Sequence, residues 1–202
     1  MPYQLGEQGI NICMTDYCVN LNLSINPLIE SVTINDINPN NSEQWMLVNL
    51  DYINPDLKEL FDSIGLTIKI AALFTLIPTY VSPIHLDGSD VDDLVKLNWS
   101  YNPNHNMVWY KIKEGASNQP MTRKSNLGNR AYVYYQREEI EEAHRAPVGF
   151  PSLIQAGIPH NVERYEGVRK CLSILLIRKV PDVNGKLIVS MNDAKTMFAN
   201  YI

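Results

Sequence analysis

The chain contains little cysteine, no excess of positive charge and no long apolar run, and each shortage excludes a class of protein. Its 202 residues include three cysteines (Cys13, Cys18 and Cys171) and no C-x-x-C pair, which fits a reducing compartment better than a disulfide framework. A Cys13–Cys18 disulfide would require export. The net charge of −5 argues against a broad nucleic-acid-binding surface, which would need clustered lysine and arginine. The longest apolar run, Ile68–Pro78, contains Lys69 and is too short to span a bilayer.

The first residues contain neither the basic segment nor the apolar segment of a secretory signal, so we expect a cytoplasmic protein. Apolar residues make up 45% of the chain and charged residues 19%, as in a globular domain rather than a disordered segment. The length suits one domain with a well-buried core. We therefore expect a single domain over residues 1–202, with no membrane contact and no nucleic-acid partner.

Short apolar segments separated by turn residues run through most of the sequence. Pro55, followed by apolar residues at helical spacing, predicts a helix at about 55–64, and residues 192–201 are expected to form a terminal helix. The charged segment 138–145 is expected to be helical or turn-like. Strands are predicted at residues 67–76, 80–87, 96–101, 107–113, 131–136, 152–156, 158–164 and 169–179.

Turn residues suggest how these strands connect. The strands at 96–101 and 107–113 are expected to pair with each other, and residues 165–167 to form a tight turn between the last two strands. Many short strands joined in this way favour a mainly β fold with a few flanking helices. A double-stranded β-helix, the cupin-like jelly roll, fits the strand count. The chain then divides into an N-terminal extension with the first helix, a barrel core and a C-terminal tail with a helix, at residues 1–66, 67–180 and 181–202.

The motif His85-Leu86-Asp87 is the most informative short pattern, because side chains two apart on a strand point to the same side. His160, from a distant strand, could complete one face of a metal octahedron. Two histidines and one carboxylate with three open positions form the facial triad of non-haem Fe(II) oxygenases. The alternative is a hydrogen-bonded structural histidine. Asp87 weakens that alternative, since a buried carboxylate needs a partner or a metal.

A second feature follows on the next predicted strand. Alternation there places Arg169, Cys171 and Ser173 on one face of the strand and a set of apolar side chains on the other. If the apolar face packs in a core, the first face borders a cavity, where a guanidinium group suits a bidentate carboxylate. An exposed surface arginine is the alternative. A metal triad beside an anion-binding arginine indicates a dicarboxylate co-substrate that chelates the metal.

In this order and spacing the chain resembles the H-x-D…H…R signature of Fe(II)/2-oxoglutarate-dependent dioxygenases, over roughly residues 67–180. Three further segments are similar to the aspartyl/asparaginyl β-hydroxylase and prolyl-hydroxylase-like branches, namely Leu97–Trp99, Met107–Tyr110 and His160–Val162. The resemblance implies that His85, Asp87 and His160 hold Fe(II) and that 2-oxoglutarate chelates the metal. Oxidative decarboxylation of 2-oxoglutarate to succinate and CO2 would then drive hydroxylation. Halogenating relatives lack the carboxylate ligand, so the presence of Asp87 favours hydroxylation.

The resemblance also implies a binding site for the co-substrate. Arg169 would bind the C5 carboxylate of 2-oxoglutarate, helped by Ser173 or Tyr80. Apart from the resemblance, Asn98 is a candidate hydrogen-bond donor to the co-substrate or to a ligand. If Arg169 points elsewhere, Arg164 is the reserve candidate. The substrate would be a small metabolite, a free amino acid or a peptidyl side chain.

The remaining candidate residues have simpler explanations. His105 lies in a polar turn and His144 in a charged segment, and both are expected to be solvated. Residues 115–129 are expected to form a mobile loop, either a solvated connection or a lid over the site. The strand aromatics favour packing over substrate contact, since large aromatics dominate cores. They are Trp99, Trp109, Tyr110, Tyr132, Tyr134 and Tyr135.

Two other functions remain open from the sequence. A metal-dependent cupin that does not use 2-oxoglutarate would have no need of Arg169. A non-catalytic ligand-binding barrel would keep the fold without turnover. Metal content separates the second of these from the enzymes, and binding of 2-oxoglutarate separates the two enzymes from each other.

Overall fold

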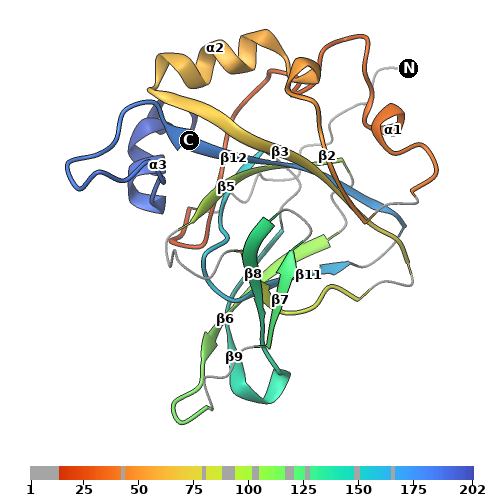
Figure 1. Cartoon of the computed structure of the whole chain (residues 1–202), viewed down its shortest axis with the longest axis vertical. Helices are drawn as coiled ribbons and strands as arrows, with labels where there is room; N and C mark the ends of the chain where they lie inside the picture. The colour runs from red at the N-terminus through yellow and green to blue at the C-terminus, as the bar shows by residue number, and fades with distance from the viewer. Residues whose placement is uncertain are drawn as a thin grey trace, which may run out of the picture.

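The computed structural model describes residues 14–41, 44–78, 81–87, 94–101, 105–116, 121–125, 128–147, 151–164 and 167–202. Within these residues the protein is mainly β, with two antiparallel six-stranded sheets and a few short helices (Figure 1). None of the described helices is long and apolar enough to cross a membrane.

The first sheet has the strand order β1-β10-β5-β12-β3-β2. Its strands are β1 (Cys18–Asn20), β10 (Ser152–Gln155), β5 (Val95–Ser100), β12 (Arg169–Arg178), β3 (Leu66–Leu76) and β2 (Trp45–Leu47). β12 and β3 pair over ten residues and form its centre, with one register shift between Leu175 and Leu176. The two short strands from the N-terminal segment, β1 and β2, extend this sheet at its two edges.

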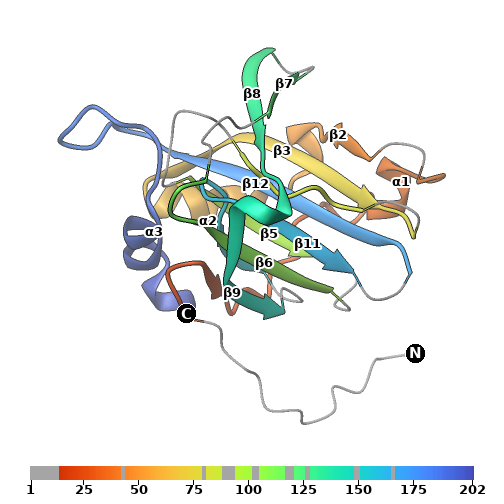
Figure 2. The same cartoon turned by 90° about the horizontal axis from the view of Figure 1, so that it is seen from below.

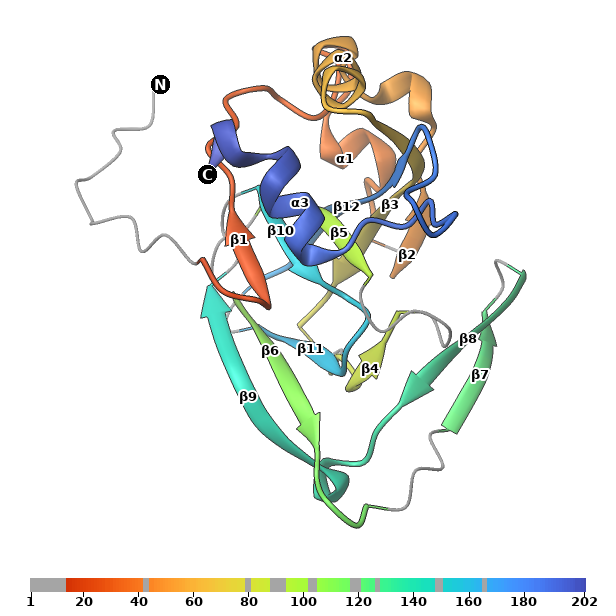
Figure 3. The ribbon, with the colours of Figure 1, turned by 90° about the vertical axis from the view of Figure 1, so that its left-hand side faces the viewer.

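The second sheet has the strand order β7-β8-β4-β11-β6-β9. Its strands are β7 (Met121–Ser125), β8 (Gly128–Tyr134), β4 (His85–Leu86), β11 (His160–Arg164), β6 (His105–Ile112) and β9 (Ile140–Pro147). β4 has only two residues but joins β8 to β11. β7 and β8 form an antiparallel ribbon that projects from the body of the molecule (Figures 2 and 3).

Helices cover the outer face of the first sheet. They are α1 (Ile34–Ile37), α2 (Pro55–Ser63) and α3 (Met191–Met197). Single 3₁₀ turns lie at Leu50–Tyr52 and Ala199–Tyr201, and another at Arg137–Glu139 leads into β9 of the second sheet. α2 begins where the Asn54 side chain accepts a hydrogen bond from the Asp56 N–H, with Pro55 in the first turn. Figure 3 shows α2 and α3 on the side of the first sheet away from the second sheet.

The two faces of β12 have different surroundings. Leu172, Ile174 and Leu176 lie in the main core, which also includes buried side chains of α2 and α3. Arg169, Cys171 and Ser173 face the other way and line a cavity between the sheets. The alternation expected from the sequence is therefore confirmed. A smaller core closes one end of the space between the sheets and joins Cys18 and Ile154 of the first sheet to Met107 and Trp109 of the second.

The expected pairing of the strands at 96–101 and 107–113 is wrong. Strands β5 and β6 do not pair, because β5 lies in the first sheet and β6 in the second. The strands β11 and β12, on either side of the tight turn expected at 165–167, also lie in different sheets, while residues 165–166 of that turn lie outside the described residues. Apolar alternation indicates which face of a strand is buried but does not identify its hydrogen-bonded neighbour. The chain crosses between sheets at both places.

Two local assignments are also wrong. The charged segment expected to be helical or turn-like is strand β9 from Ile140 onward, preceded by one 3₁₀ turn. In β9, Ile140 and Ala146 are buried while the charged side chains between them are exposed or half-buried, so the charges concealed the pattern of a strand. The expected loop at 115–129 is largely the ribbon of β7 and β8 in its described part.

Candidate metal centre

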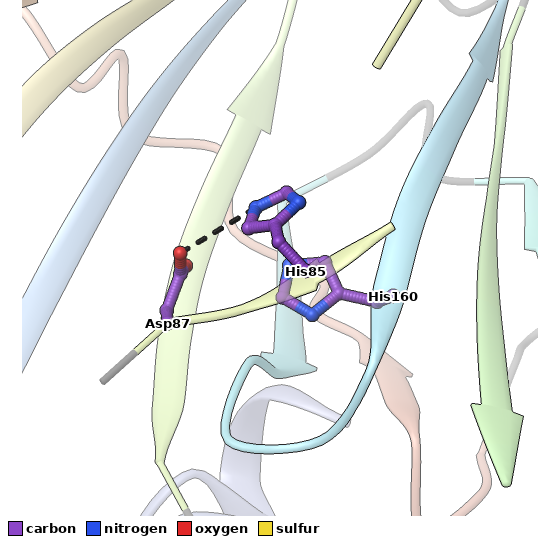
Figure 4. Close-up of side chains that lie close together, drawn as sticks. All are labelled: His85, Asp87 and His160. Carbon is purple, nitrogen blue, oxygen red and sulfur yellow. Dashed lines mark ion pairs between the residues drawn. The ribbon is translucent and has the colours of Figure 1, made fainter. Parts of the chain in front are cut away.

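His85 and His160 lie directly opposite each other on the neighbouring antiparallel strands β4 and β11. Their ring centroids are 4.6 Å apart and the rings are inclined by 50°. Asp87 follows β4, where its backbone N–H donates to the Ala156 carbonyl at 2.9 Å. Nitrogen and oxygen atoms of the three side chains lie within 4.8 Å of one another (Figure 4). This buried group could hold a metal ion and resembles a two-histidine, one-carboxylate site.

Backbone carbonyls orient both imidazole rings in the same way. His85 Nδ1 donates to the carbonyl of Pro83 at 2.9 Å, and His160 Nδ1 donates to the carbonyl of Ile158 at 2.8 Å. A carbonyl oxygen only accepts, so each Nδ1 carries the proton and the Nε2 of a neutral ring carries the lone pair. A histidine ligand in a metal site is commonly held in this manner. In both cases the carbonyl belongs to the residue two positions earlier.

Burial favours the neutral, ligating form of His160. Its side chain is 3% exposed, and burial lowers its pKa to about 4. The neighbouring His85 lowers the pKa further, while Asp87 opposes both effects. His160 is therefore neutral at pH 7.

Asp87 has a partner that the sequence did not suggest. Lys96, from β5 of the opposite sheet, donates from Nζ to Asp87 Oδ2 at 2.6 Å, and Asp87 Oδ1 lies 3.5 Å from His85 Nε2. Burial raises the pKa of Asp87, but the ammonium of Lys96, helped by the neighbouring imidazoles of His85 and His160, holds that pKa well below its usual range. Asp87 is thus ionised. The signal available in the sequence was that Lys96 and Asn98 alternate with the apolar residues Val95, Leu97 and Trp99, and so share one face of the strand.

The triad opens into a cavity of about 290 Å³ between the sheets. Three of the predicted co-substrate residues line it: Arg169, Ser173 and Asn98. Ser173 and Asn98 are paired across β12 and β5, and all three side chains are at most 6% exposed. Arg169 Nε and Asn98 Oδ1 are buried and have no hydrogen-bond partner among the described residues. Unpaired buried polar atoms are costly, so they indicate where a bound group would be received.

The cavity carries a net positive charge. Its charged lining residues, within the described part of the chain, are Asp87, Lys96 and Arg169. With neutral histidines, two cations and one carboxylate give a formal charge of +1. A divalent cation on the triad would raise this charge to +3. An anionic ligand carrying more than one negative charge matches such a cavity.

Two further predicted residues cannot be placed in the site. Tyr80 lies outside the described residues. Arg164 ends β11, where its backbone pairs with that of His105, but its side chain is not among those described.

The strand aromatics divide between core and cavity. Trp109 is fully buried and its Nε1–H donates to the Gln155 carbonyl at 2.8 Å, and Trp99 lies in the main core. Tyr110 donates to Asn161 Oδ1 at 3.0 Å, and Tyr135 packs nearby in a small cluster.

Tyr134 lines the cavity, and the side chain of Tyr132 lies outside the described set. Trp45 and Phe74, which the sequence did not single out, also line the cavity.

The expectation that His105 and His144 are solvated is wrong. His105 begins β6, is 2% exposed and lies with Nε2 3.1 Å from Ser100 Oγ. His144 is half-buried in β9 and stacks on Tyr17, with ring centroids 5.2 Å apart. Polar neighbours in the sequence concealed the fact that both histidines occupy strands. Neither belongs to the group that could hold a metal.

No protein-family model matches the chain, and no curated protein sequence is detectably similar to it.

Proposed function

We propose that the protein is an Fe(II)- and 2-oxoglutarate-dependent oxygenase that hydroxylates a small metabolite or an amino-acid side chain, free or peptidyl. The observation that carries this proposal is the joining of two features in one cavity. One is the buried triad of His85, Asp87 and His160, and the other is the buried guanidinium of Arg169 with an unpaired Nε.

The order of the strands supports a double-stranded β-helix. Eight strands pair as nested antiparallel couples: β3 with β12, β4 with β11, β5 with β10 and β6 with β9. The strands from β3 to β6 thus form one arm of a long hairpin, and the strands from β9 to β12 form the antiparallel return arm that pairs with it. This long hairpin is rolled so that its strands alternate between two sheets, which is the arrangement of a jelly roll. The H-x-D motif, which begins on β4, and the distal histidine on β11 then meet where these two strands pair.

The donor set of the triad fits Fe(II). Imidazole nitrogen and carboxylate oxygen are the ligands of non-haem Fe(II) centres, and a three-ligand face leaves coordination positions open. When bound, Fe(II) supplies the activation of O2, with 2-oxoglutarate oxidised to succinate and CO2 as one oxygen atom enters the substrate C–H bond. The carbonyls of Pro83 and Ile158 keep both Nε2 atoms available to the metal.

The lining of the cavity suits the 2-oxoglutarate dianion. Arg169 would bind the C5 carboxylate through its fork of N–H groups, with Ser173 Oγ as a second donor. Asn98 on β5 lies opposite Ser173 on β12 and would hydrogen-bond the co-substrate or a water beside it. Trp45, Phe74 and Tyr134 supply large apolar surfaces that exclude water from the reacting groups.

The test is an anaerobic titration of the metal-free protein with Fe(II) and then 2-oxoglutarate. We expect a visible charge-transfer absorption that needs both additions, because 2-oxoglutarate chelates the metal through a carboxylate and the keto oxygen. His160→Ala should abolish the band. His144→Ala, which alters a histidine outside the triad, is the matched control and should retain it.

Two outcomes would contradict the proposal and favour its alternatives. Fe(II) binding without the band would favour a metal-dependent barrel enzyme that does not use 2-oxoglutarate. Absence of any metal binding would favour a non-catalytic ligand-binding barrel.

A further inference from the structure

Lys96 crosses the cavity from one sheet to the other. It lies on β5 of the first sheet, and its Nζ bonds the carboxylate of Asp87, which follows β4 of the second sheet, at 2.6 Å. Both side chains are largely buried, with 15% and 12% of their surfaces exposed. The ammonium also lies 5.9 Å from the centroid of the Phe74 ring. Lys96 therefore lines the proposed site and contacts the triad directly.

The metal-free protein needs this ammonium. A buried ionised carboxylate is costly unless a counter-charge accompanies it, and Lys96 is the cation that bonds Asp87 among the described residues. A divalent ion on the triad would supply that counter-charge instead. Lys96 would then face a like charge across the carboxylate, which weakens the affinity for the metal alone.

A chelating ligand changes the balance again. With a divalent metal the cavity has a formal charge of +3, and a dianion reduces it to +1. Arg169 accounts for one carboxylate of that dianion and the metal for the other, so the remaining charge is that of Lys96. Its ammonium has three donors on a flexible stem and lies beside the triad, where a metal-bound carboxylate would sit. The Phe74 ring, 5.9 Å from the ammonium, also favours a cation at this place in the cavity.

We propose that Lys96 exchanges partners. It neutralises Asp87 in the metal-free protein, and it bonds the metal-chelating carboxylate of the dicarboxylate ligand once the metal is bound. Lys96 is thus a co-substrate-binding residue that makes ligand affinity depend on the metal. This inference rests on the proposed function.

The test compares Lys96→Met with Lys96→Arg by calorimetry at one fixed pH, with Mn(II) as a metal that supports no turnover. Methionine keeps the unbranched stem and removes the charge, whereas arginine keeps the charge. We expect Lys96→Met to bind Mn(II) at least as tightly as the unmutated protein. Its affinity for 2-oxoglutarate in the Mn(II)-loaded state should fall by about 10-fold or more. Lys96→Arg should recover most of that loss, and Lys69→Met, a change at an exposed lysine of β3, should alter neither affinity.

The opposite pattern would overturn the inference. If Lys96→Met weakens Mn(II) binding and leaves the affinity of the loaded protein for 2-oxoglutarate unchanged, Lys96 serves Asp87 alone. If the unmutated protein binds no Mn(II), or binds Mn(II) but no 2-oxoglutarate, the proposed function fails and this inference fails with it. The two failures are distinguishable, because the first appears only in the variant.

Thermal unfolding gives a second readout if Lys96→Met is unstable without metal. The loss of Asp87's partner should lower the melting temperature of the metal-free variant, and Mn(II) should restore it. The rise in melting temperature on adding Mn(II) should therefore be larger in Lys96→Met than in the unmutated protein. An equal or smaller rise would contradict the exchange of partners.

Discussion

The two walls of the cavity are built in different ways. The wall that carries the triad has a strand of only two residues, β4, and each histidine ring is oriented by the carbonyl two positions before it. The opposite wall depends on long strands in register, with Arg169 and Ser173 on β12 and Asn98 on β5. In the triad wall, local contacts orient the two imidazole rings, although His85 and His160 meet through the pairing of β4 with β11. In the opposite wall, pairing between distant strands alone places Ser173 beside Asn98.

The largest expected effect comes from the triad itself. Replacing Asp87 by Ala removes one of the three metal ligands. The affinity for Mn(II) should therefore fall by more than roughly 100-fold, which is the largest loss usual for mutating a residue that only hydrogen-bonds a ligand. Calorimetry with Mn(II) measures this directly. If the variant binds Mn(II) as tightly as the unmutated protein, Asp87 is not a metal ligand.

Acid should destabilise the metal-free protein through the same wall. Burial lowers the pKa of His160 to about 4 against about 6.5 for a free histidine, so the unfolded chain binds more protons between these values. The contribution of His160 to the free energy of unfolding should therefore be complete above about pH 6.5. It should fall by on the order of 3 kcal/mol as the pH drops to about 4. Chemical denaturation across this range measures the slope. His160→Gln should flatten it, and an unchanged slope in that variant would show that the loss arises elsewhere.

A substitution in the opposite wall should weaken the binding of 2-oxoglutarate and leave the binding of Mn(II) nearly unchanged. Arg169→Met should weaken binding of 2-oxoglutarate to the Mn(II)-loaded protein by about 100-fold, because a charge-assisted bidentate contact is lost. Affinity for Mn(II) alone should stay within a few-fold. Arg178→Met, at the far end of the same strand, is the control for damage to β12. Equal losses for metal and ligand would erase the distinction between the two walls.

A smaller effect is expected at the neighbouring hydroxyl. Ser173→Ala should weaken binding of 2-oxoglutarate by about fivefold, the size of one neutral hydrogen bond. Calorimetry with the Mn(II)-loaded protein checks it. No change at all would mean that Ser173 lines the cavity without contacting the co-substrate.

The same contrast explains what could be predicted from the sequence. His85 and Asp87 are two residues apart, so strand geometry predicted a common face, although Asp87 lies just beyond the two-residue strand β4. The pairing of His160 with His85 depends on the register of distant strands and had to be assumed. Mainly β structure and the alternation along β12 were predictable, because apolar periodicity reports on burial.

Partners across the cavity were not predictable. Lys96 looked like an ordinary strand lysine, since its bond to Asp87 joins two sheets that the sequence did not separate. The sheet assignments of β5 and β6 were missed for the same reason. His105 and His144 were misjudged because polar neighbours in sequence do not show which residues lie beside them in space.

The most direct test of the central claim is a crystal structure of the protein with Mn(II) and 2-oxoglutarate. We predict the metal on Nε2 of His85, Nε2 of His160 and one carboxylate oxygen of Asp87, with the C5 carboxylate of 2-oxoglutarate on Arg169. A metal bound elsewhere, or a co-substrate carboxylate directed away from Arg169, would contradict the claim.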